Sequence, residues 1–408
     1  MTDFIDGGIC AARGFRAAGV HAGVKSHNPL KKDVALIVSD CDCACAALYT
    51  RNAVKAAHII VDRRHLADGI ARAAVINSGN ANACAPHGEE HAESICAKVG
   101  EAVGCSAANV VIASTGVIGQ ELNARVIEEA IPGLYAGMTA DAAGSDAAAQ
   151  AIMTTDTVKK ELALETVIGG KTVRMGGIAK GSGMIHPNMG TMLCFLTTDC
   201  AISPAMIRTA LLECAAVSFN RISVDGDTST NDTCCAMANG LAGNAPITAD
   251  GDDYRAFVAA LRTLCIRLAV AMASDGEGAR HLITCTVSGA SSEASAETLA
   301  KSVISSTLTK AAVFGSDANW GRVLCAMGYS GEKFNPGGVN ISFESAAGSV
   351  EVCRNGCGLA FDEDLAKRIL SEHDIVIRIA MGEGSAHCTC WGCDITYDYI
   401  KINGDYRT

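Results

Sequence analysis

Two contrasting segments meet in the run Lys180-Gly-Ser-Gly-Met-Ile-His-Pro-Asn-Met-Gly190-Thr191-Met-Leu-Cys-Phe-Leu-Thr-Thr-Asp199. The first segment is rich in Gly, Pro and Asn and favours turns, whereas the second is apolar and favours a β-strand. Gly190 lacks a Cβ and can expose its carbonyl to the hydroxyl of Thr191, which suits self-cleavage. A threonine at a new N-terminus carries nucleophile and base on one residue, and this indicates an acyl-transfer enzyme. The same residue types also fit a glycine and an ordinary β-branched residue at a strand entrance, so that alternative stays open.

The composition is that of a globular protein with a core of small and aliphatic residues. Hydrophobic residues make up 49% of the 408 positions, but aromatic residues make up only 4%, and 42 residues are glycine. Ala, Val, Ile, Leu and Cys must therefore fill the core. The length is sufficient for two or three domain-sized cores or for one large intertwined fold.

The charge balance argues against two classes of partner. With 33 basic and 44 acidic residues, the formal net charge is −11, which disfavours nucleic acid and anionic membrane surfaces. The N-terminus lacks the basic start and apolar core of a signal peptide, and we expect no apolar run of membrane-spanning length. The sequence predicts a soluble, cytoplasmic protein.

Strand patterns and helix patterns alternate along the whole chain, which predicts an α/β fold. Residues 33–40 have the pattern of a strand that can continue to Tyr49, and Gly169-Gly170 marks the turn of a hairpin. The only boundary that we predict is chemical, between Gly190 and Thr191. Further predicted elements are the hairpin strands over 158–167 and 172–178, helices over 121–130 (ending near Pro132) and 256–273, and strands over 311–314 and 394–402.

Three further positions carry candidate chemistry, each with a structural alternative. Ser114-Thr115-Gly116 follows a predicted strand, and a glycine amide beside a hydroxyl can form an oxyanion hole, although Ser and Thr also cap helices. Lys180 can bind a substrate carboxylate, or it is a solvated lysine at a strand end. Glu277, between two glycines after the longest predicted helix, can pair with a substrate ammonium, or it is a charged turn residue.

We interpret the 20 cysteines as free thiols that serve as small core residues. Disulfide frameworks are typical of short secreted chains, and this chain is long and has no signal-peptide pattern. Two Cys-rich segments, Cys41–Cys45 and His387–Cys393, are the candidates for a metal site, with Cys353 and Cys357 as a second pair. Structural zinc sites need two ligand pairs at matching positions, so we predict no metal.

Taken together and in this order, several short motifs resemble the glutamate N-acetyltransferase/ornithine acetyltransferase family of arginine biosynthesis. The resemblance covers essentially the whole chain. Gly190 stands where alanine is common in that family, and the two Cys-rich segments are enriched over the family pattern. The motifs are Asn77-Ser-Gly-Asn-Ala-Asn-Ala83, Ser114-Thr-Gly116, Met153-Thr-Thr-Asp-Thr157, the run from Lys180 to Asp199, Asp275-Gly-Glu-Gly278, Phe314-Gly-Ser-Asp-Ala-Asn-Trp-Gly-Arg322, Trp391-Gly-Cys-Asp394 and the tail Lys401-Ile-Asn-Gly-Asp-Tyr-Arg-Thr408.

The resemblance implies a layered α/β sandwich that is N-terminal-nucleophile-like, and autoprocessing into an α chain of residues 1–190 and a β chain of residues 191–408. Thr191 is implied as the acetyl-accepting nucleophile, and Thr115 and Gly116 as the oxyanion hole. The two chains are expected to stay associated and to form an α2β2 heterotetramer or a larger assembly. The implied substrate-binding residues are Thr154, Lys180, Thr191, Glu277, Asn403 and Thr408.

The implied reaction transfers an acetyl group from N-acetylornithine to glutamate through an acetyl-enzyme, with no metal or organic cofactor. Whether acetyl-CoA is a second donor is left open by the sequence. One rival interpretation is an N-terminal-nucleophile aminopeptidase or amidase of related fold, in which water replaces glutamate. The other is a non-catalytic, Cys-rich metal-binding protein.

Overall fold

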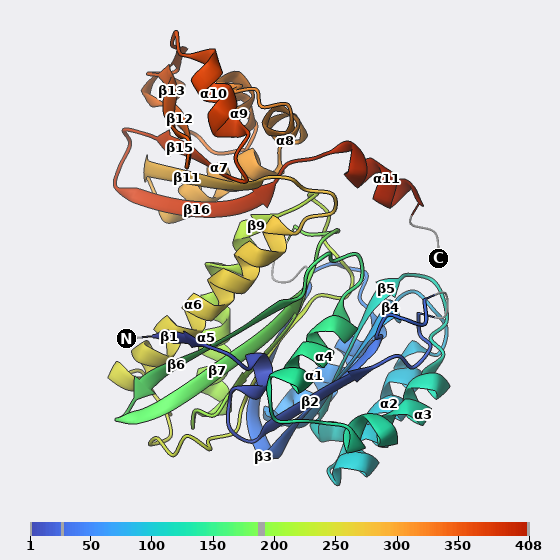
Figure 1. Cartoon of the computed structure of the whole chain (residues 1–408). Helices are drawn as coiled ribbons and strands as arrows, with labels where there is room; N and C mark the ends of the chain where they lie inside the picture. The colour runs from blue at the N-terminus through green and yellow to red at the C-terminus, as the bar shows by residue number, and fades with distance from the viewer. Residues whose placement is uncertain (1, 26–27, 187–191, 406–408) are drawn as a thin grey trace. The chain divides into compact units, whose positions relative to one another are not determined.

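The computed structural model describes residues 2–25, 28–186 and 192–405 of the chain (Figure 1). Strands and helices alternate throughout, so the predicted α/β class is confirmed. The chain forms two compact units, and their limits do not coincide with the boundary at residues 190 and 191. Unit 1 comprises Met1–Gly181, Pro187–Asn220 and Thr228–Met272, and unit 2 comprises Ser182–His186, Arg221–Asp227 and Ala273–Thr408.

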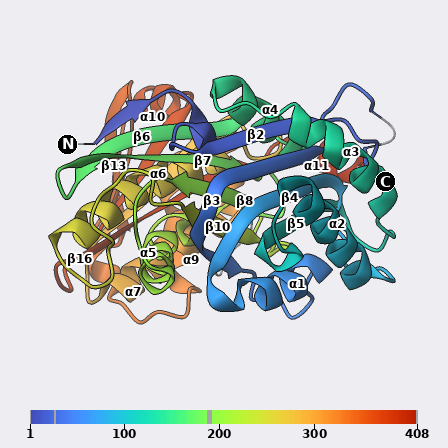
Figure 2. The same ribbon diagram turned by 90° about the horizontal axis from the view of Figure 1, so that it is seen from below.

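Unit 1 is built around one large sheet. Over the described residues its strands follow the order β1-β6-β7-β8-β10-β3-β4-β5, with β2 paired to β3 (Figure 2). The pairing of β3 with β4 is interrupted by a bulge between Val38 and Cys43, so the first part of β3 lies between β2 and β4 while its last part pairs with β10. The strands are β1 (Asp3–Ile5), β2 (Phe15–Val20), β3 (Val34–Tyr49), β4 (Ile70–Asn80), β5 (Val110–Val117), β6 (Lys160–Ile168), β7 (Lys171–Lys180), β8 (Leu193–Thr198) and β10 (Thr233–Ala238).

Helices cover both faces of this sheet, which explains the near-continuous apolar runs in its strands. Along β3, Val34, Leu36 and Val38 face a core that also contains residues of α2 and α3. Ala35 and Ile37 face a second core that contains residues of α4. The helices are α1 (Ala57–His65), α2 (Gly88–Val103), α3 (Ala124–Ala136), α4 (Ala142–Ile152), α5 (Pro204–Ala216) and α6 (Asp252–Ser274).

Small residues determine how closely α4 packs on the sheet. A Cβ at Gly19 of β2 would lie 2.1 Å from the carbonyl oxygen of Ala147, and a Cβ at Gly144 would lie 2.5 Å from that of Ala17. Backbone therefore meets backbone where α4 crosses β2, which requires that neither glycine carries a side chain. This close packing is one structural cause of the glycine-rich composition.

Helix α6 corrects one expectation. Among the described residues it is the one helix that is long and apolar enough to cross a membrane by length and composition, although we expected no apolar run of that length. Its Leu264, Cys265 and Leu268 are fully buried. A Cβ at Gly177 of β7 would lie 2.8 Å from Leu268, so the helix packs closely on the sheet. Because an apolar helix is also what a protein core requires, we interpret α6 as a core helix of unit 1.

The segments on either side of residues 190 and 191 share the sheet of unit 1. β7 pairs antiparallel with β8, with Lys180 opposite Leu193. β10 pairs with β8 on one side and with β3 on the other. Cleavage between residues 190 and 191 would therefore leave a hydrogen-bonded sheet made of both fragments, and the fragments would stay associated.

Unit 2 holds a second sheet, whose strands follow the order β14-β13-β12-β15-β11-β16-β9 over the described residues. Ile283, Cys285 and Val287 of β11 face a core shared with α7, α9 and α10, and Thr284 and Thr286 between them are partly exposed. The strands are β9 (Ile222–Ser223), β11 (Leu282–Ala290), β12 (Asn340–Ser345), β13 (Gly348–Arg354), β14 (Cys357–Gly358), β15 (Asp374–Ala380) and β16 (Ala386–Cys393). The helices are α7 (Glu293–Ser305), α8 (Thr307–Phe314), α9 (Trp320–Gly328), α10 (Glu363–Leu370) and α11 (Tyr397–Asp405). Short 3-10 helices in the two units are Gly8–Cys10, Leu66–Asp68, Ala107–Asn109, Phe219–Arg221 and Pro336–Gly338.

Two predicted strands were wrong because capped helices form there instead. Residues 311–314 belong to α8, and the side chain of Ser306 caps its first turn. The strand predicted over 394–402 overlaps α11, before which Thr396 Oγ1 accepts from the backbone N–H of Tyr399 at 3.3 Å. Ser and Thr favour such positions because their oxygens satisfy N–H groups that the helix leaves open.

The predicted end of a helix at Pro132 was also wrong. α3 continues to Ala136, with Pro132 inside it. Pro132 lies on the exposed side of the helix, where water can satisfy the carbonyl group that proline leaves without a donor. The opposite side, with Ile131 and Leu134, is buried and holds the helix on the core.

Candidate active site

The end of β5 in unit 1 carries the predicted oxyanion residues. β5 runs parallel to β4, with Ser78 opposite Thr115 and Gly79 opposite Gly116. Gly116 has a φ of 131°, and a Cβ there would lie 2.3 Å from the carbonyl carbon of Gly79, so no side chain fits. The alternative of a helix cap is wrong, since these residues belong to β5 and the N-cap residue of α3 is Asn123. The glycine and the buried Thr115 thus adjoin each other as an oxyanion hole requires.

Lys180 lies at the end of β7 and reaches the same place. Its Nζ donates to Thr115 Oγ1 at 3.3 Å. Lys180 and Thr115 are each only 8% exposed, so the alternative of a solvated lysine is wrong. A buried ammonium beside a hydroxyl favours a negatively charged ligand group, such as a carboxylate.

Asp156 connects this lysine to the predicted substrate-binding Thr154. Its Oδ2 accepts from the backbone N–H of Thr154 at 3.0 Å, and its Oδ1 accepts from that of Gly181 at 2.8 Å. Lys160 Nζ also donates to Oδ1, at 2.5 Å, and both side chains of this pair are fully buried. Burial alone would raise the pKa of Asp156, but the charges of Lys160 and Lys180 hold it at about 2. Asp156 was not among the predicted site residues, although it lies inside the motif that contains Thr154.

Lys25 is a second residue that the sequence analysis missed. Its Nζ donates to the carbonyl oxygen of Met153 at 2.7 Å and to that of Lys32 at 3.0 Å. Burial lowers the pKa of Lys25 to about 8. It therefore holds the backbone immediately before Thr154. No sequence signal marks it, because a single lysine after a glycine and a valine is common.

Glu277 and Asn403 are brought together in unit 2. Asn403 Nδ2 donates to Glu277 Oε2 at 2.6 Å, and the backbone N–H of Glu277 donates to the carbonyl oxygen of Ser182 at 2.9 Å. A Cβ at Gly183 would lie 2.4 Å from the carboxyl carbon of Glu277, so this glycine leaves room for the carboxylate. Glu277 does lie in a turn, as the structural alternative expected, but its carboxylate is buried. A buried carboxylate favours a cationic ligand group.

Three of the predicted site residues lie outside the described part of the chain. They are the two residues at the predicted cleavage site, Gly190 and Thr191, and the C-terminal Thr408. Their predicted roles stay predictions. Of the others, Thr115, Gly116, Thr154 and Lys180 gather in unit 1, and Glu277 and Asn403 form a pair in unit 2.

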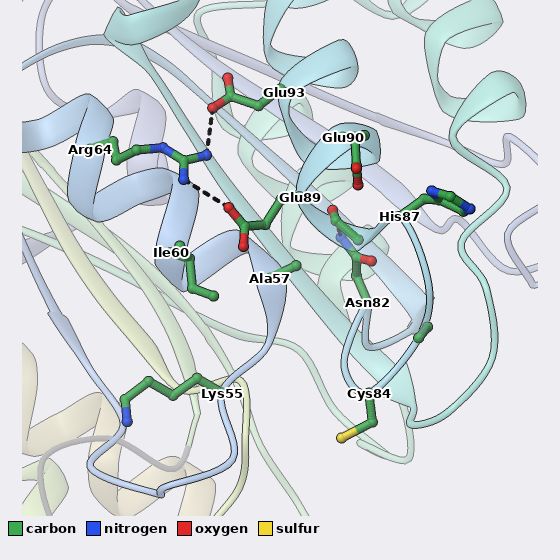
Figure 3. A pocket seen from close by; sticks show the side chains of 12 residues that line it. Lys55, Ala57, Ile60, Arg64, Asn82, Cys84, His87, Glu89, Glu90 and Glu93 are labelled. Atoms are coloured by element: carbon green, nitrogen blue, oxygen red, sulfur yellow. Dashed lines mark hydrogen bonds and ion pairs between the residues drawn. The ribbon is translucent and has the colours of Figure 1, made fainter.

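A surface pocket of about 700 Å³ lies elsewhere in unit 1, at the start of α2 (Figure 3). Arg64 projects into it and donates to Glu89 Oε2 at 2.7 Å and to Glu93 Oε1 at 2.9 Å. Asn82 and Cys84, which also line it, have positive φ angles. None of the predicted site residues that the structure describes lines this pocket. The volume of this pocket alone therefore does not identify it as the active site.

The Cys-rich segments lie mostly in the cores of the two units. Cys43 and Cys45 of β3 and Cys388 and Cys390 of β16 are buried. Burial raises the pKa of Cys43 to about 12, which keeps that thiol protonated. Within residues 2–25, 28–186 and 192–405, no three His, Cys, Asp or Glu side chains gather in a way that could hold a metal ion. These thiols fit the use of cysteine as a small core residue.

Comparison with known proteins decides the family. A family model described as the ArgJ family matches residues 16–408. The chain belongs to the ArgJ family. Among its ArgJ relatives, the arginine biosynthesis bifunctional protein of Symbiobacterium thermophilum is 48% identical over 407 residues, and that of Caldanaerobacter subterraneus subsp. tengcongensis is 46% identical over 408 residues. Each comparison covers 100% of both chains. The crystal structure of ArgJ from Bacillus halodurans is similar with 40% identity and a TM-score of 0.49, over 52% of this chain and 97% of that chain.

Membership of the ArgJ family confirms the family that the sequence motifs indicated. It argues against the rival of a non-catalytic metal-binding protein, because the relatives are named as biosynthetic enzymes over their full length. The roles of individual residues are predictions that combine the ArgJ motifs with the geometry of the two units.

Proposed function

We propose that this ArgJ protein transfers the acetyl group of N2-acetyl-L-ornithine to L-glutamate by a ping-pong mechanism on Thr191. The observation that carries the proposal is the buried contact between Lys180 and Thr115, next to Gly116. In the sheet, Lys180 lies opposite Leu193, which follows Thr191 by two positions in the sequence. A hydroxyl and a backbone N–H group can stabilise the oxyanion of acyl transfer, and the buried ammonium beside them can bind a substrate carboxylate.

The first half-reaction forms an acetyl-enzyme. Thr191 Oγ attacks the carbonyl carbon of the acetyl group, and the α-amine of Thr191 accepts the hydroxyl proton. The hydroxyl of Thr115 and the N–H of Gly116 stabilise the negative charge on the acetyl oxygen. The bond between the acetyl carbon and nitrogen then breaks, and the leaving amine takes the proton and departs as ornithine.

The second half-reaction returns the enzyme to its starting state. The amine of glutamate attacks the acetyl carbon of the ester on Thr191 and gives a proton to the α-amine of Thr191. The bond between Thr191 Oγ and the acetyl carbon then breaks, Oγ takes that proton, and N-acetylglutamate leaves. An N-terminal amine has an ordinary pKa of about 7.7–8.0, so it can act as a neutral base near neutral pH. The mechanism uses no metal or organic cofactor.

Recognition of the substrates follows from the charges of the site residues. We assign Lys180 to the α-carboxylate that both amino acids share, and Glu277 to an ammonium group such as that of the ornithine side chain. Asn403, which donates to Glu277, orients that carboxylate. Thr154 and Thr408 are assigned to further substrate contacts.

The nucleophile is created by self-cleavage between Gly190 and Thr191 in this proposal. The resulting α chain (1–190) and β chain (191–408) stay together because β8 and β10 pair with strands from the first fragment. We further propose an α2β2 heterotetramer in the cytoplasm. Acetyl-CoA is proposed as a second donor, which would make the protein bifunctional.

Kinetics with the two substrates tests the reaction. We expect parallel lines in double-reciprocal plots with N-acetylornithine and glutamate, and exchange of labelled ornithine into N-acetylornithine without glutamate. The aminopeptidase or amidase alternative predicts instead that water accepts the acyl group and that acetate is released at the same rate without glutamate. Acetylation of glutamate from acetyl-CoA is measured in the same assay with that donor.

A further inference from the structure

Asn231 lies just before β10 and contacts two carbonyl groups beside the predicted oxyanion hole. Its Nδ2 donates to the carbonyl oxygen of Ser114 at 2.8 Å and to that of Ala81 at 2.5 Å. The residue is only 5% exposed. Ser114 immediately precedes Thr115, and Ala81 follows the end of β4, which pairs with β5 around Gly116.

The amide of Asn231 is fixed in one orientation because its other polar atoms are paired as well. Thr230 Oγ1 donates to Asn231 Oδ1 at 2.5 Å. The backbone N–H donates to Ser229 Oγ at 3.1 Å, and the backbone carbonyl accepts from Thr233 Oγ1 at 3.1 Å. A primary amide supplies two N–H groups from one nitrogen, which matches the two carbonyl acceptors.

The backbone around Asn231 is itself held in place. The N–H of Ala56 donates to the carbonyl oxygen of Thr230 at 3.0 Å, and the N–H of Thr50 donates to that of Asp232 at 3.1 Å. The side chain of Asn231 therefore projects from a backbone that these hydrogen bonds hold in place. It can fix a peptide group that is 117 positions away in the sequence.

Holding the carbonyl of Ser114 constrains Thr115 directly. The carbonyl of Ser114 and the N–H of Thr115 belong to one planar peptide group, so fixing the oxygen fixes the plane from which the Thr115 side chain departs. The side chain of Ser114 is held separately, since its Oγ donates to Asn77 Oδ1 at 2.7 Å. A buried carbonyl that loses its donor is left unsatisfied, which favours a different peptide orientation.

We infer that Asn231 is a positioning residue for the oxyanion hole and acts by holding the carbonyl groups of Ser114 and Ala81. The inference rests on the proposed function, because it takes Thr115 and Gly116 as the oxyanion hole. After the proposed cleavage, Asn231 belongs to the fragment that carries the nucleophile, whereas the oxyanion residues belong to the other. Each fragment thus contributes to the geometry of the same hole.

Two variants of the full chain test the inference, with a matched control. Asn231→Asp keeps the size of the side chain but removes both N–H donors, and Asn231→Ala removes the side chain. Asn52→Ala is the control, because Asn52 Nδ2 donates to the carbonyl oxygen of Thr228 at 3.0 Å and so holds the segment that carries Asn231 without touching β5. The measurements are kcat and KM for acetyl transfer, the melting temperature, and the rate at which the two fragments appear.

We expect both Asn231 variants to lower kcat by roughly 10- to 100-fold with KM changed less than about threefold, because misplaced donors weaken transition-state stabilisation. Asn52→Ala should keep kcat within about twofold of wild type. The melting temperatures show how much stability each variant loses. If Asn231→Asp is processed slowly, its rate of fragment formation should be lowered, relative to that of Asn52→Ala, by the same factor as its kcat.

A double variant shows whether Asn231 acts through Thr115. Adding Asn231→Asp to Thr115→Ala should lower kcat by no more than about threefold beyond Thr115→Ala alone, since the group being positioned is already gone. The inference would be overturned if the kcat losses of Asn231→Asp and Thr115→Ala multiply in full in the double variant. It would also be overturned if Asn231→Asp has wild-type kinetics or loses no more kcat than Asn52→Ala. Wild-type kcat in Thr115→Ala would instead contradict the proposed oxyanion hole itself.

Discussion

The buried cluster of Lys180, Thr115 and Asp156 and the surface pocket beside α2 are both polar. They differ in how far their charged side chains are exposed to water. In the cluster, the ammonium of Lys180 and the carboxylate of Asp156 are removed from water and held by specific partners. In the pocket, the side chain of Arg64 is 52% exposed and its carboxylate partners Glu89 and Glu93 are similarly open. Buried charges are costly unless they are paired, whereas exposed ion pairs contribute only about 0–1 kcal/mol. This difference in exposure supports our proposal that the chemistry takes place at the buried cluster and not in the pocket beside α2.

Replacing Lys180 should have the largest effect on catalysis. Lys180→Met removes a buried positive charge that we assign to the carboxylate of both substrates. Loss of such a partner typically costs about 2–5 kcal/mol, so kcat/KM should fall by a factor of roughly 30 to 4000 in both half-reactions, with the upper end expected because this lysine is buried. Steady-state kinetics measures kcat/KM for each substrate, and exchange of labelled ornithine measures the first half-reaction by itself. Values within a few-fold of wild type would place Lys180 outside the substrate site.

Replacing Thr115 should have the next largest effect. Thr115→Ala should lower kcat by roughly 10²–10³-fold, with little change in KM, because its hydroxyl donates to the charge that develops in the transition state. The same variant is compared with wild type in a thermal melt. A loss of melting temperature without a loss of kcat would mean that Thr115 has only a structural role.

The buried pair in the cluster should make stability depend on acid pH. The pKa of Asp156 lies at about 2 in the folded protein, below its unfolded value of about 3.9. A lowered carboxyl pKa contributes stability above the unfolded pKa, and that contribution is lost as pH falls through the folded one. We therefore expect about 2–3 kcal/mol to be lost from this residue between roughly pH 4 and pH 2.

Denaturant unfolding at several pH values measures this contribution. Asp156→Asn should be destabilised at pH 7, because Lys160 remains buried without its charged partner, and it should lack this part of the acid dependence. Glu129→Gln is a suitable control, since Glu129 forms an exposed pair with Arg125. Identical pH profiles for wild type and Asp156→Asn would contradict the assignment.

Disrupting the pocket beside α2 should have the smallest effect. Arg64→Ala breaks the ion pairs with Glu89 and Glu93, yet we expect a stability change below about 1 kcal/mol and kcat within about twofold of wild type. Kinetics and melting curves for this variant complete the comparison with Lys180→Met. A loss of activity as large as that of the lysine variant would reverse the contrast between the two regions.

Local sequence signals predicted the parts of the fold and site that depend on neighbouring residues. Gly169 and Gly170 both have positive φ angles, and two such residues between apolar strands are the signal of a tight hairpin. β6 and β7 pair around this turn as predicted. Gly116 was also identified from its local motif, and the structure shows the close contact with Gly79 that excludes a side chain.

Residues whose roles depend on distant partners could not be found in the same way. Asp156 accepts from Gly181, which is 25 positions away, and Asn231 donates to Ser114, which is 117 positions away. Asp and Asn are common in polar loops, so their residue types alone do not distinguish these roles from ordinary turns. Lys25 became recognisable only when the fold placed its ammonium against the carbonyl of Met153.

The mass of the purified protein tests the central claim, that a new N-terminal Thr191 is the nucleophile, most directly. Intact-mass analysis of denatured wild type should find two fragments, residues 1–190 and 191–408, whose masses sum to that of the whole chain plus one water. Thr191→Ala should remain one chain and be inactive, whereas Thr191→Ser should still be processed because it keeps the hydroxyl. A wild-type protein that is uncleaved and fully active in acetyl transfer would contradict the claim.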